Sequence, residues 1–302
     1  MKRRVLLAVL ALLLFGVGYV AWTLAGLPPV KYYLCYGLDP YCEPTGAKET
    51  YEGVEFIEIG PGIFRMGSTF LAEGGDWLGK ICAPLGLPWG EHPEPSKEMP
   101  VHWVEFRHGF WIARTELTNA QYERFRGGYE RSLYSKGDDT PAVEVSWEDA
   151  RAYCGWMSER SGRRIRLPSE AEWECASRAG SRDEFPCGDT DPGSRACGCF
   201  LEEFSDDAPT VRAKPPNRWG LFGFHCSVWE WCEDRWHNDY EGAPSDGSPW
   251  TETDLELPDC VIRGGCRGSD PEECRSAHRH WDQPWSRYHA IGFRPAITSP
   301  GD

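Results

Sequence analysis

The second half of the chain is its most constraining feature, because beyond Gly180 it is dominated by Gly, Pro, Asp and Trp and shows no helical periodicity. Such a stretch cannot take its order from long helices, so specific side-chain packing must hold it in place. The chain's 15 tryptophans can supply that packing, since one aromatic side chain buries roughly 150–250 Å². We therefore expect a domain whose second half has little regular secondary structure.

The first half shows clearer signals for strands. Residues 54–59 alternate between apolar and polar, break at a Gly-Pro-Gly turn, and are followed by a second alternating run from Ile63. Residues 69–100 are rich in Gly and Pro and predict a long surface loop, after which residues 101–112 resume strand-like alternation. We expect a hairpin followed by a further strand.

Three helices are predicted from capping boxes, in which a hydroxyl residue caps the helix and a residue three positions later reaches back to the cap amide. The pairs are Thr118 with Gln121, Ser146 with Asp149, and Ser169 with Glu172. We expect the first helix to stop at Gly127 and the third at Gly180. Cys154 and Cys175 fall among apolar neighbours on these helices, which favours small buried side chains over reactive thiols.

The N-terminus predicts a membrane anchor. Residues 5–27 are apolar without a charge and follow a Lys-Arg-Arg run; as a helix they would be about 34 Å long, enough to cross a core of ~30 Å. The basic flank favours a cytoplasmic N-terminus and a body facing the periplasm or the extracellular side. We expect an anchor at 1–27, a stalk at 28–53 and a domain at 54–297, with a cleaved signal peptide as the alternative to the anchor.

Charge and cysteine content narrow the function classes. The formal net charge of −15 disfavours a nucleic-acid partner, which would need clustered Lys and Arg to displace counterions. Thirteen cysteines suit an exported protein with disulfides, and a local bridge between Cys35 and Cys42 is one expectation. No paired CxxC occurs, so the spacing is not that of a zinc site.

An ordered series of short phrases resembles the formylglycine-generating enzyme (sulfatase-modifying factor) family. The resemblance covers nearly everything beyond the predicted stalk, and it implies an α+β fold, C-type-lectin-like, with low regular secondary structure. The phrases are Met66-Gly67-Ser68, Thr115-Glu116-Leu117-Thr118-Asn119, Pro141-Ala142-Val143-Glu144-Val145-Ser146-Trp147, Arg166-Leu167-Pro168-Ser169-Glu170-Ala171-Glu172-Trp173-Glu174, Asn217-Arg218-Trp219-Gly220-Leu221, Val228-Trp229-Glu230-Trp231, Arg263-Gly264-Gly265, Arg275-Ser276-Ala277 and Gly292-Phe293-Arg294.

The same resemblance implies a copper site that this chain carries only in part. Active members resemble one another in two cysteines, five apart, shortly after the Gly-Gly pair, and soft thiolates are the ligands that select Cu(I). Counted forward from Gly265 without gaps, Ser269 takes the first thiol position and Cys274 the second, whereas counting back from Arg279 shifts the register by three and matches neither thiol. Cys274 with Cys266 is the remaining candidate catalytic pair, and copper is expected only if that pair works as an enzyme.

A structural calcium site is a second implication of the resemblance. Its ligands would be the Glu230 carboxylate and the backbone carbonyls of Cys226 and Val228, with Gly223 where the family has Asp or Asn. Calcium prefers six or more oxygens, so the missing side chain weakens the site. A buried, hydrogen-bonded Glu230 is the alternative. The family's Gly-Asn before this phrase is Cys226-Ser227 here, at a place where Gly can need a positive φ.

The segment after Gly265 corresponds to the groove that receives an extended peptide in active relatives. Aromatic, Arg and short polar residues interleave there, a composition typical of recognition surfaces and also of Trp-rich loops packed on a core. His278 and His280 lie two residues apart, and no carboxylate pattern accompanies them, so we expect them to hydrogen-bond or face solvent rather than bind a metal. The candidate ligand-binding residues are Arg267, Asp270, His278, His280, Trp281, Trp285, Arg287 and Tyr288.

We therefore expect a non-catalytic recognition or accessory module whose partner is a peptide, a protein or a glycan. The alternative is a copper-dependent oxidase that converts a peptide cysteine to formylglycine.

Overall fold

The computed structural model describes residues 41–68, 97–185, 208–253 and 258–299. The globular unit begins at Cys42 rather than at Val54. The predicted anchor at 1–27 and the stalk up to residue 40 lie outside the described residues, as do Cys35 and residues 69–96 of the predicted loop. Within the described ranges, no helix is both long and apolar enough to cross a membrane.

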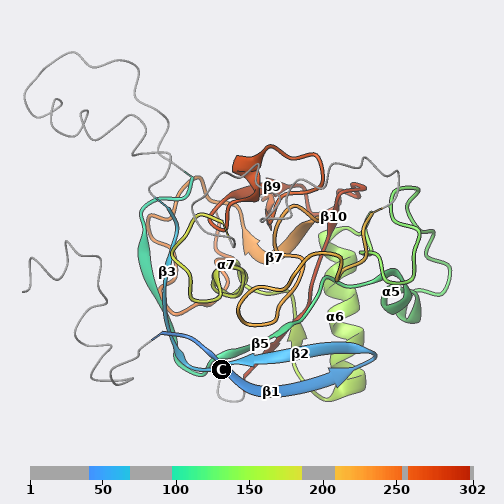
Figure 1. Ribbon diagram of the computed structural model, residues 1–302, viewed down its shortest axis with the longest axis horizontal. Coiled ribbons are helices and arrows are strands. Elements are labelled where there is room, and N and C mark those ends of the chain that lie inside the picture. The colour runs from blue at the N-terminus through green and yellow to red at the C-terminus, as the bar shows by residue number, and fades with distance from the viewer. Residues whose placement is uncertain (1–40, 69–96, 186–207, 254–257, 300–302) are drawn as a thin grey trace, which may run out of the picture. The chain divides into compact units, whose positions relative to one another are not determined.

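A five-stranded sheet occupies one side of the unit, in the order β1-β2-β5-β11-β6, with every neighbouring pair antiparallel. Its outer hairpin is drawn in blue at the base of Figure 1. The strands are β1 (Pro44–Tyr51), β2 (Val54–Ile59), β5 (Phe110–Ala113), β6 (Ile165–Arg166) and β11 (Ala296–Thr298).

The position of β1 corrects the predicted stalk, which extended to residue 53. Residues 44–51 pair with β2 as an edge strand of the domain. The strand is mostly exposed, so it lacks the apolar alternation by which a strand is recognised in sequence. Cys42, just before it, is a free thiol buried beside Cys175. The other cysteine of the predicted bridge, Cys35, lies outside the described residues, so that bridge stays a prediction.

The run at 101–112 forms two strands rather than one. β3 (Gly62–Met66) pairs with β4 (His102–Phe106) in a separate two-stranded sheet, whereas β5 belongs to the five-stranded sheet. Gly109 makes the turn between them with φ +68°, and a side chain there would collide with the carbonyl of Ile59.

All three predicted helices are present, and each has the expected capping box. They are α5 (Asn119–Phe125), α6 (Trp147–Ser161) and α7 (Glu170–Arg178). The C-cap of the first is Arg126 and that of the third is Ala179, each one residue before the predicted glycine. Cys154 and Cys175 are buried, and burial raises the pKa of both thiols, which agrees with their predicted role as small core side chains.

The second half contributes a four-stranded sheet, β10-β7-β8-β9, against which α7 packs (Figure 1). The strands are β7 (Trp229–Arg235), β8 (Cys260–Arg263), β9 (Arg279–Asp282) and β10 (Ile291–Gly292), with a 3₁₀ turn η3 (Pro271–Cys274) before β9. Beyond Gly180 the described chain contains no α-helix. Trp173 and Trp231 are fully buried, as the packing role of the tryptophans requires. The α+β fold with low regular structure is confirmed.

Candidate functional site

A disulfide between Cys226 and Cys274 lies at the centre of the candidate site. It joins the residues just before β7 to the end of η3 across a sequence separation of 48. Cys226 has φ +49°, so it adopts the left-handed conformation for which the family's glycine is suited. Both residues are buried, and the sulfur of Cys274 is therefore not a free thiol in this structure.

The other candidate catalytic cysteine, Cys266, is a half-buried free thiol beside Ser269. The Cys266 amide donates to the Ser269 hydroxyl at 3.1 Å, and the Ser269 amide donates to the Cys266 carbonyl at 3.0 Å. Burial raises the pKa of the Cys266 thiol, which disfavours the thiolate that metal binding and nucleophilic attack require. Because Cys274 is bonded to Cys226, the two candidates do not form a pair of thiols here.

The Glu230 carboxylate is buried and fully engaged by hydrogen bonds. Arg294 donates to both of its oxygens at 2.6 Å, and the Trp173 indole donates to one of them at 2.9 Å. The carbonyl of Cys226 accepts from the Lys214 ammonium at 2.9 Å. Val228 is buried and directly precedes β7, the strand that contains Glu230. Protein donors therefore already occupy the Glu230 and Cys226 oxygens, so these two residues do not fit a calcium ion as they stand.

Glu116 fills the space next to Gly223, where the resemblance expects Asp or Asn. A side chain at position 223, which has φ +77°, would collide with the Glu116 carboxylate. Burial raises the pKa of Glu116 to about 7, opposed by Arg294 and supported by the nearby charge of Glu230. Within the described residues, no group of three or more His, Cys, Asp or Glu side chains is placed to hold a metal.

The predicted recognition segment places its aromatic side chains in solvent. Trp281, Trp285 and Tyr288 are 38%, 48% and 51% exposed, and the Tyr134 ring meets the His289 ring at 4.7 Å. Backbone hydrogen bonds from Glu144 and Trp147 to this segment fix it against the start of α6. We call the following set the aromatic surface: Leu133, Tyr134, Trp281, Trp285 and Tyr288.

The polar candidates divide between this surface and the interior. His280 is exposed next to Trp281, and Arg287 is an exposed partner of Asp149. Arg267 and Asp270 are exposed around η3, on the same segment. His278 instead turns inward, where burial lowers the pKa of its imidazole to about 3. It is therefore neutral at physiological pH.

Buried arginines are the main feature that sequence reasoning missed. Arg279 donates to both oxygens of Glu170 at 2.7 and 2.8 Å, and Arg263 donates to Glu174 at 2.6 Å. All of these side chains have almost no exposed surface. Arg263 and Arg294 do belong to the sequence phrases that carry the family resemblance. Such a phrase does not show which carboxylate each arginine pairs with in the fold. These ion pairs fix the residues at which β9 and the recognition segment begin.

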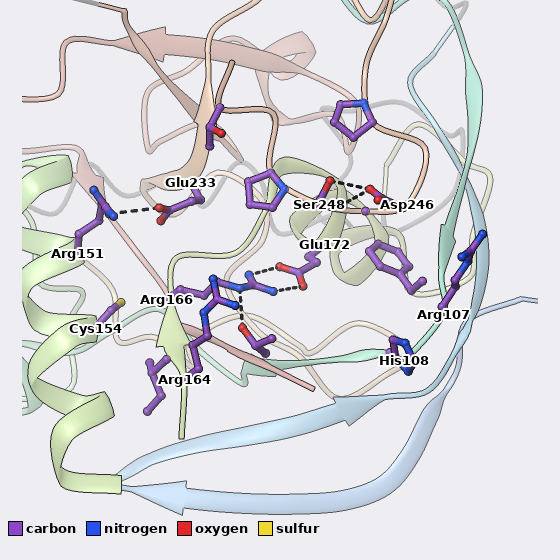
Figure 2. A pocket seen from close by; sticks show the side chains of 18 of the residues that line it. Arg107, His108, Arg151, Cys154, Arg164, Arg166, Glu172, Glu233, Asp246 and Ser248 are labelled. Atoms are coloured by element: carbon purple, nitrogen blue, oxygen red, sulfur yellow. Dashed lines mark hydrogen bonds and ion pairs between the residues drawn. The ribbon is translucent and has the colours of Figure 1, made fainter. Parts of the chain in front are cut away.

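A cavity of about 1050 Å³ on another face was also missed (Figure 2). It is bounded by one side of α6, by β6, by the turn between β4 and β5, and by a loop at residues 244–251. No residue of the aromatic surface lines it.

Residues 43–299 match the sulfatase-modifying factor enzyme 1-like domain. The chain belongs to this family. Members similar to it include the formylglycine-generating enzyme of Streptomyces coelicolor, 33% identical over 70% of this chain and 85% of the relative. The inactive C-alpha-formylglycine-generating enzyme 2 of Bos taurus is 32% identical over 52% of this chain and 50% of its own.

Another relative is a longer protein, and two further similar proteins have solved structures. The serine/threonine-protein kinase pkn1 of Chlamydia caviae is 31% identical over 68% of this chain, which spans only 36% of that relative. The structure of PvdO from Pseudomonas aeruginosa is 31% identical, with a TM-score of 0.67 over 84% of this chain and 98% of its own. Treponema denticola variable protein 1 shares the fold at 20% identity, with a TM-score of 0.63 over 83% of this chain and 98% of its own.

Proposed function

We propose that this domain is a recognition or accessory module without formylglycine-generating activity, and that it binds its partner through the aromatic surface. The partner is an exposed peptide, protein or glycan on the exported side of a membrane, to which residues 1–27 anchor the chain. The single observation that carries the proposal is where the exposed rings lie. Of the five large apolar side chains that the described residues expose, Trp281, Trp285 and Tyr288 fall within residues 280–289, and the Tyr134 ring meets the same segment at His289.

Physical chemistry supports this assignment of the surface. A soluble monomer rarely leaves several large apolar side chains exposed together, and Trp, Tyr and Arg dominate the binding energy of interfaces. Trp285 and Tyr288 leave about half of their surface in solvent, whereas the backbone beneath them is fixed by hydrogen bonds from Glu144 and Trp147. A fixed backbone reduces the entropy lost when a partner binds.

The state of the cysteines supports a module without the family's oxidase chemistry. Ser269 stands at one position of the copper pair, and the sulfur at the other position is bonded to Cys226. Copper(I) would then find one thiol in the segment, Cys266, whose pKa is raised by burial. A single thiol cannot give the two-sulfur coordination that copper(I) favours.

A pull-down from membranes that contain the full chain tests the binding role. Trp281→Ala with Trp285→Ala should reduce the recovered partner at least about tenfold, since two aromatic contacts are worth a few kcal/mol. Lys48→Ala, an exposed change on β1, is the matched control and should leave recovery unchanged. Equal recovery with the tryptophan variant would mean that the rings only cover the core.

The oxidase remains the second candidate, because relatives of this chain carry that activity in their names and Cys266 is a free thiol in the relevant segment. The test supplies copper, oxygen and a Cys-x-Pro-x-Arg peptide, with and without a reductant that opens the Cys226–Cys274 bond. The recognition proposal predicts no aldehyde in either case. Aldehyde that disappears in Cys274→Ser would establish the oxidase instead.

A further inference from the structure

The cavity of Figure 2, here called the arginine pocket, has the size of a small-molecule site. Its volume of about 1050 Å³ lies just above the roughly 300–1,000 Å³ typical of ligand pockets. Arg151 and Gly155 of α6 form part of one wall, and Arg164 and Arg166 at β6 form part of another. Residues of the loop at 244–251 also line it, including Ser245 and Thr251.

Most of the charge in the pocket is already balanced. Arg166 donates two hydrogen bonds to Glu172 at 2.6 and 2.7 Å, and Arg151 lies 3.2 Å from one oxygen of Glu233, as the dashed lines of Figure 2 show. Arg164 differs from both. Its guanidinium is exposed and makes no ion pair or hydrogen bond in the described part of the chain. The pocket therefore offers one free cationic donor.

Glu233 offers the complementary free acceptor. Its second oxygen, Oε2, is buried and receives no hydrogen bond from the described residues. Burial raises the pKa of Glu233, while Arg151, Arg166, Arg235 and Arg164 lower it. An unsatisfied buried acceptor costs about 1–3 kcal/mol, so a hydroxyl donor placed at Oε2 would bind favourably.

Gly155 keeps the pocket wall open. It lies in the middle of α6, is exposed, and a Cβ added to it would meet no atom within 4 Å. Glycine inside a helix costs about 1 kcal/mol relative to alanine, and packing does not require it here. The missing side chain leaves space beside Arg151, on the helix face that borders the cavity.

We propose that the arginine pocket binds a small polyhydroxylated carboxylate, such as a sugar acid. Its carboxylate pairs with Arg164, whose planar guanidinium matches a carboxylate with two parallel hydrogen bonds. One of its hydroxyls donates to Glu233, and others contact the hydroxyls of the 244–251 loop. A phosphate dianion is disfavoured, because it brings a second negative charge close to Glu233 and has no O–H group to donate to the Glu233 carboxylate.

Gluconate and glucitol are the matched probes, since both are hydroxylated six-carbon chains and only gluconate carries a carboxylate. Calorimetric titration of the full-length protein in detergent should give a dissociation constant for gluconate on the order of 1 mM. The dissociation constant for glucitol should be at least about tenfold higher. Arg164→Gln should weaken gluconate binding by about tenfold, the loss expected for a charge-assisted contact.

Gly155→Leu separates binding from folding, because leucine favours the helix but its side chain enters the pocket. We expect an unchanged or higher melting temperature together with loss of gluconate binding, while Gly155→Ala retains binding. Trp281→Ala with Trp285→Ala should leave gluconate affinity unchanged. The proposal for the arginine pocket and the proposal for the aromatic surface are therefore tested independently. Equal binding of gluconate and glucitol, no gluconate binding, or full binding in Arg164→Gln would overturn the proposal.

Discussion

Replacing Cys226 and Cys274 together with alanine should lower the free energy of unfolding by about 4 kcal/mol. The disulfide closes a loop with a sequence separation of 48. A cross-link over about 48 residues removes roughly 14 cal/mol/K of entropy from the unfolded chain, or about 4 kcal/mol at 25 °C. Both side chains are buried, so the lost sulfur volume adds a smaller packing cost.

Urea unfolding of wild type and double variant, each with and without reductant, isolates the cross-link. Reductant should destabilise wild type by about 4 kcal/mol more than it destabilises the double variant. The double variant measures the effect of reductant on all the remaining cysteines, so the difference isolates the Cys226–Cys274 bond. Cys266→Ala is the matched control, a free thiol of the same segment, and its response to reductant should equal that of wild type. Responses to reductant that agree within about 1 kcal/mol between wild type and the double variant would refute the loop-closure reasoning.

Three further changes test the interior. Gly223→Ala should cost more than about 3 kcal/mol in urea unfolding, because its side chain would collide with the buried Glu116 and φ is +77° there; a loss under about 1 kcal/mol would contradict this. Burial lowers the pKa of His225 to about 4, so folding keeps the imidazole neutral, and the stability that depends on the neutral form is complete above pH 6.5 and is lost as pH falls toward 4. His225→Gln should therefore flatten the dependence of unfolding free energy on pH between 6.5 and 4, and an unchanged dependence would contradict the lowered pKa. Arg275→Met should cost about 3–5 kcal/mol, because it leaves the Glu98 carboxylate buried without its two hydrogen bonds of 2.6 and 2.7 Å, and a melting temperature equal to that of wild type would disprove the pairing.

The elements that sequence predicted well are those determined by neighbours in the chain. Ser146 and Ser169 cap their helices through residues only three positions away, so the signal and its partner stand together in the sequence. The α+β fold class followed from the ordered phrases of the family. The strand at 44–51 was missed because it is an exposed edge strand, whose pairing comes from β2 rather than from its own pattern.

The candidate site was predicted only in part, because its decisive contacts join distant residues. The aromatic residues of the recognition segment were identified by composition, but only the structure shows that they are exposed. Cys274 was paired with Cys266 on sequence proximity, whereas its partner is Cys226. Glu230 was left between calcium ligand and buried hydrogen-bonded carboxylate, and its bonds to Arg294 match the second. No local pattern could have made these choices.

The buried ion pairs also support placing the proposed recognition role on residues 280–289. Arg263 and Arg279 are held by acidic partners in the interior, and removing one member of such a pair leaves an uncompensated charge that costs about 3–5 kcal/mol. The scaffold therefore tolerates little change at the start of β9. A few residues later, Trp285 and Tyr288 are about half exposed, and surface substitutions usually change stability by only about 0.5 kcal/mol. A surface that can change at so small a cost, on a backbone fixed by costly interior contacts, can acquire a partner without losing the fold.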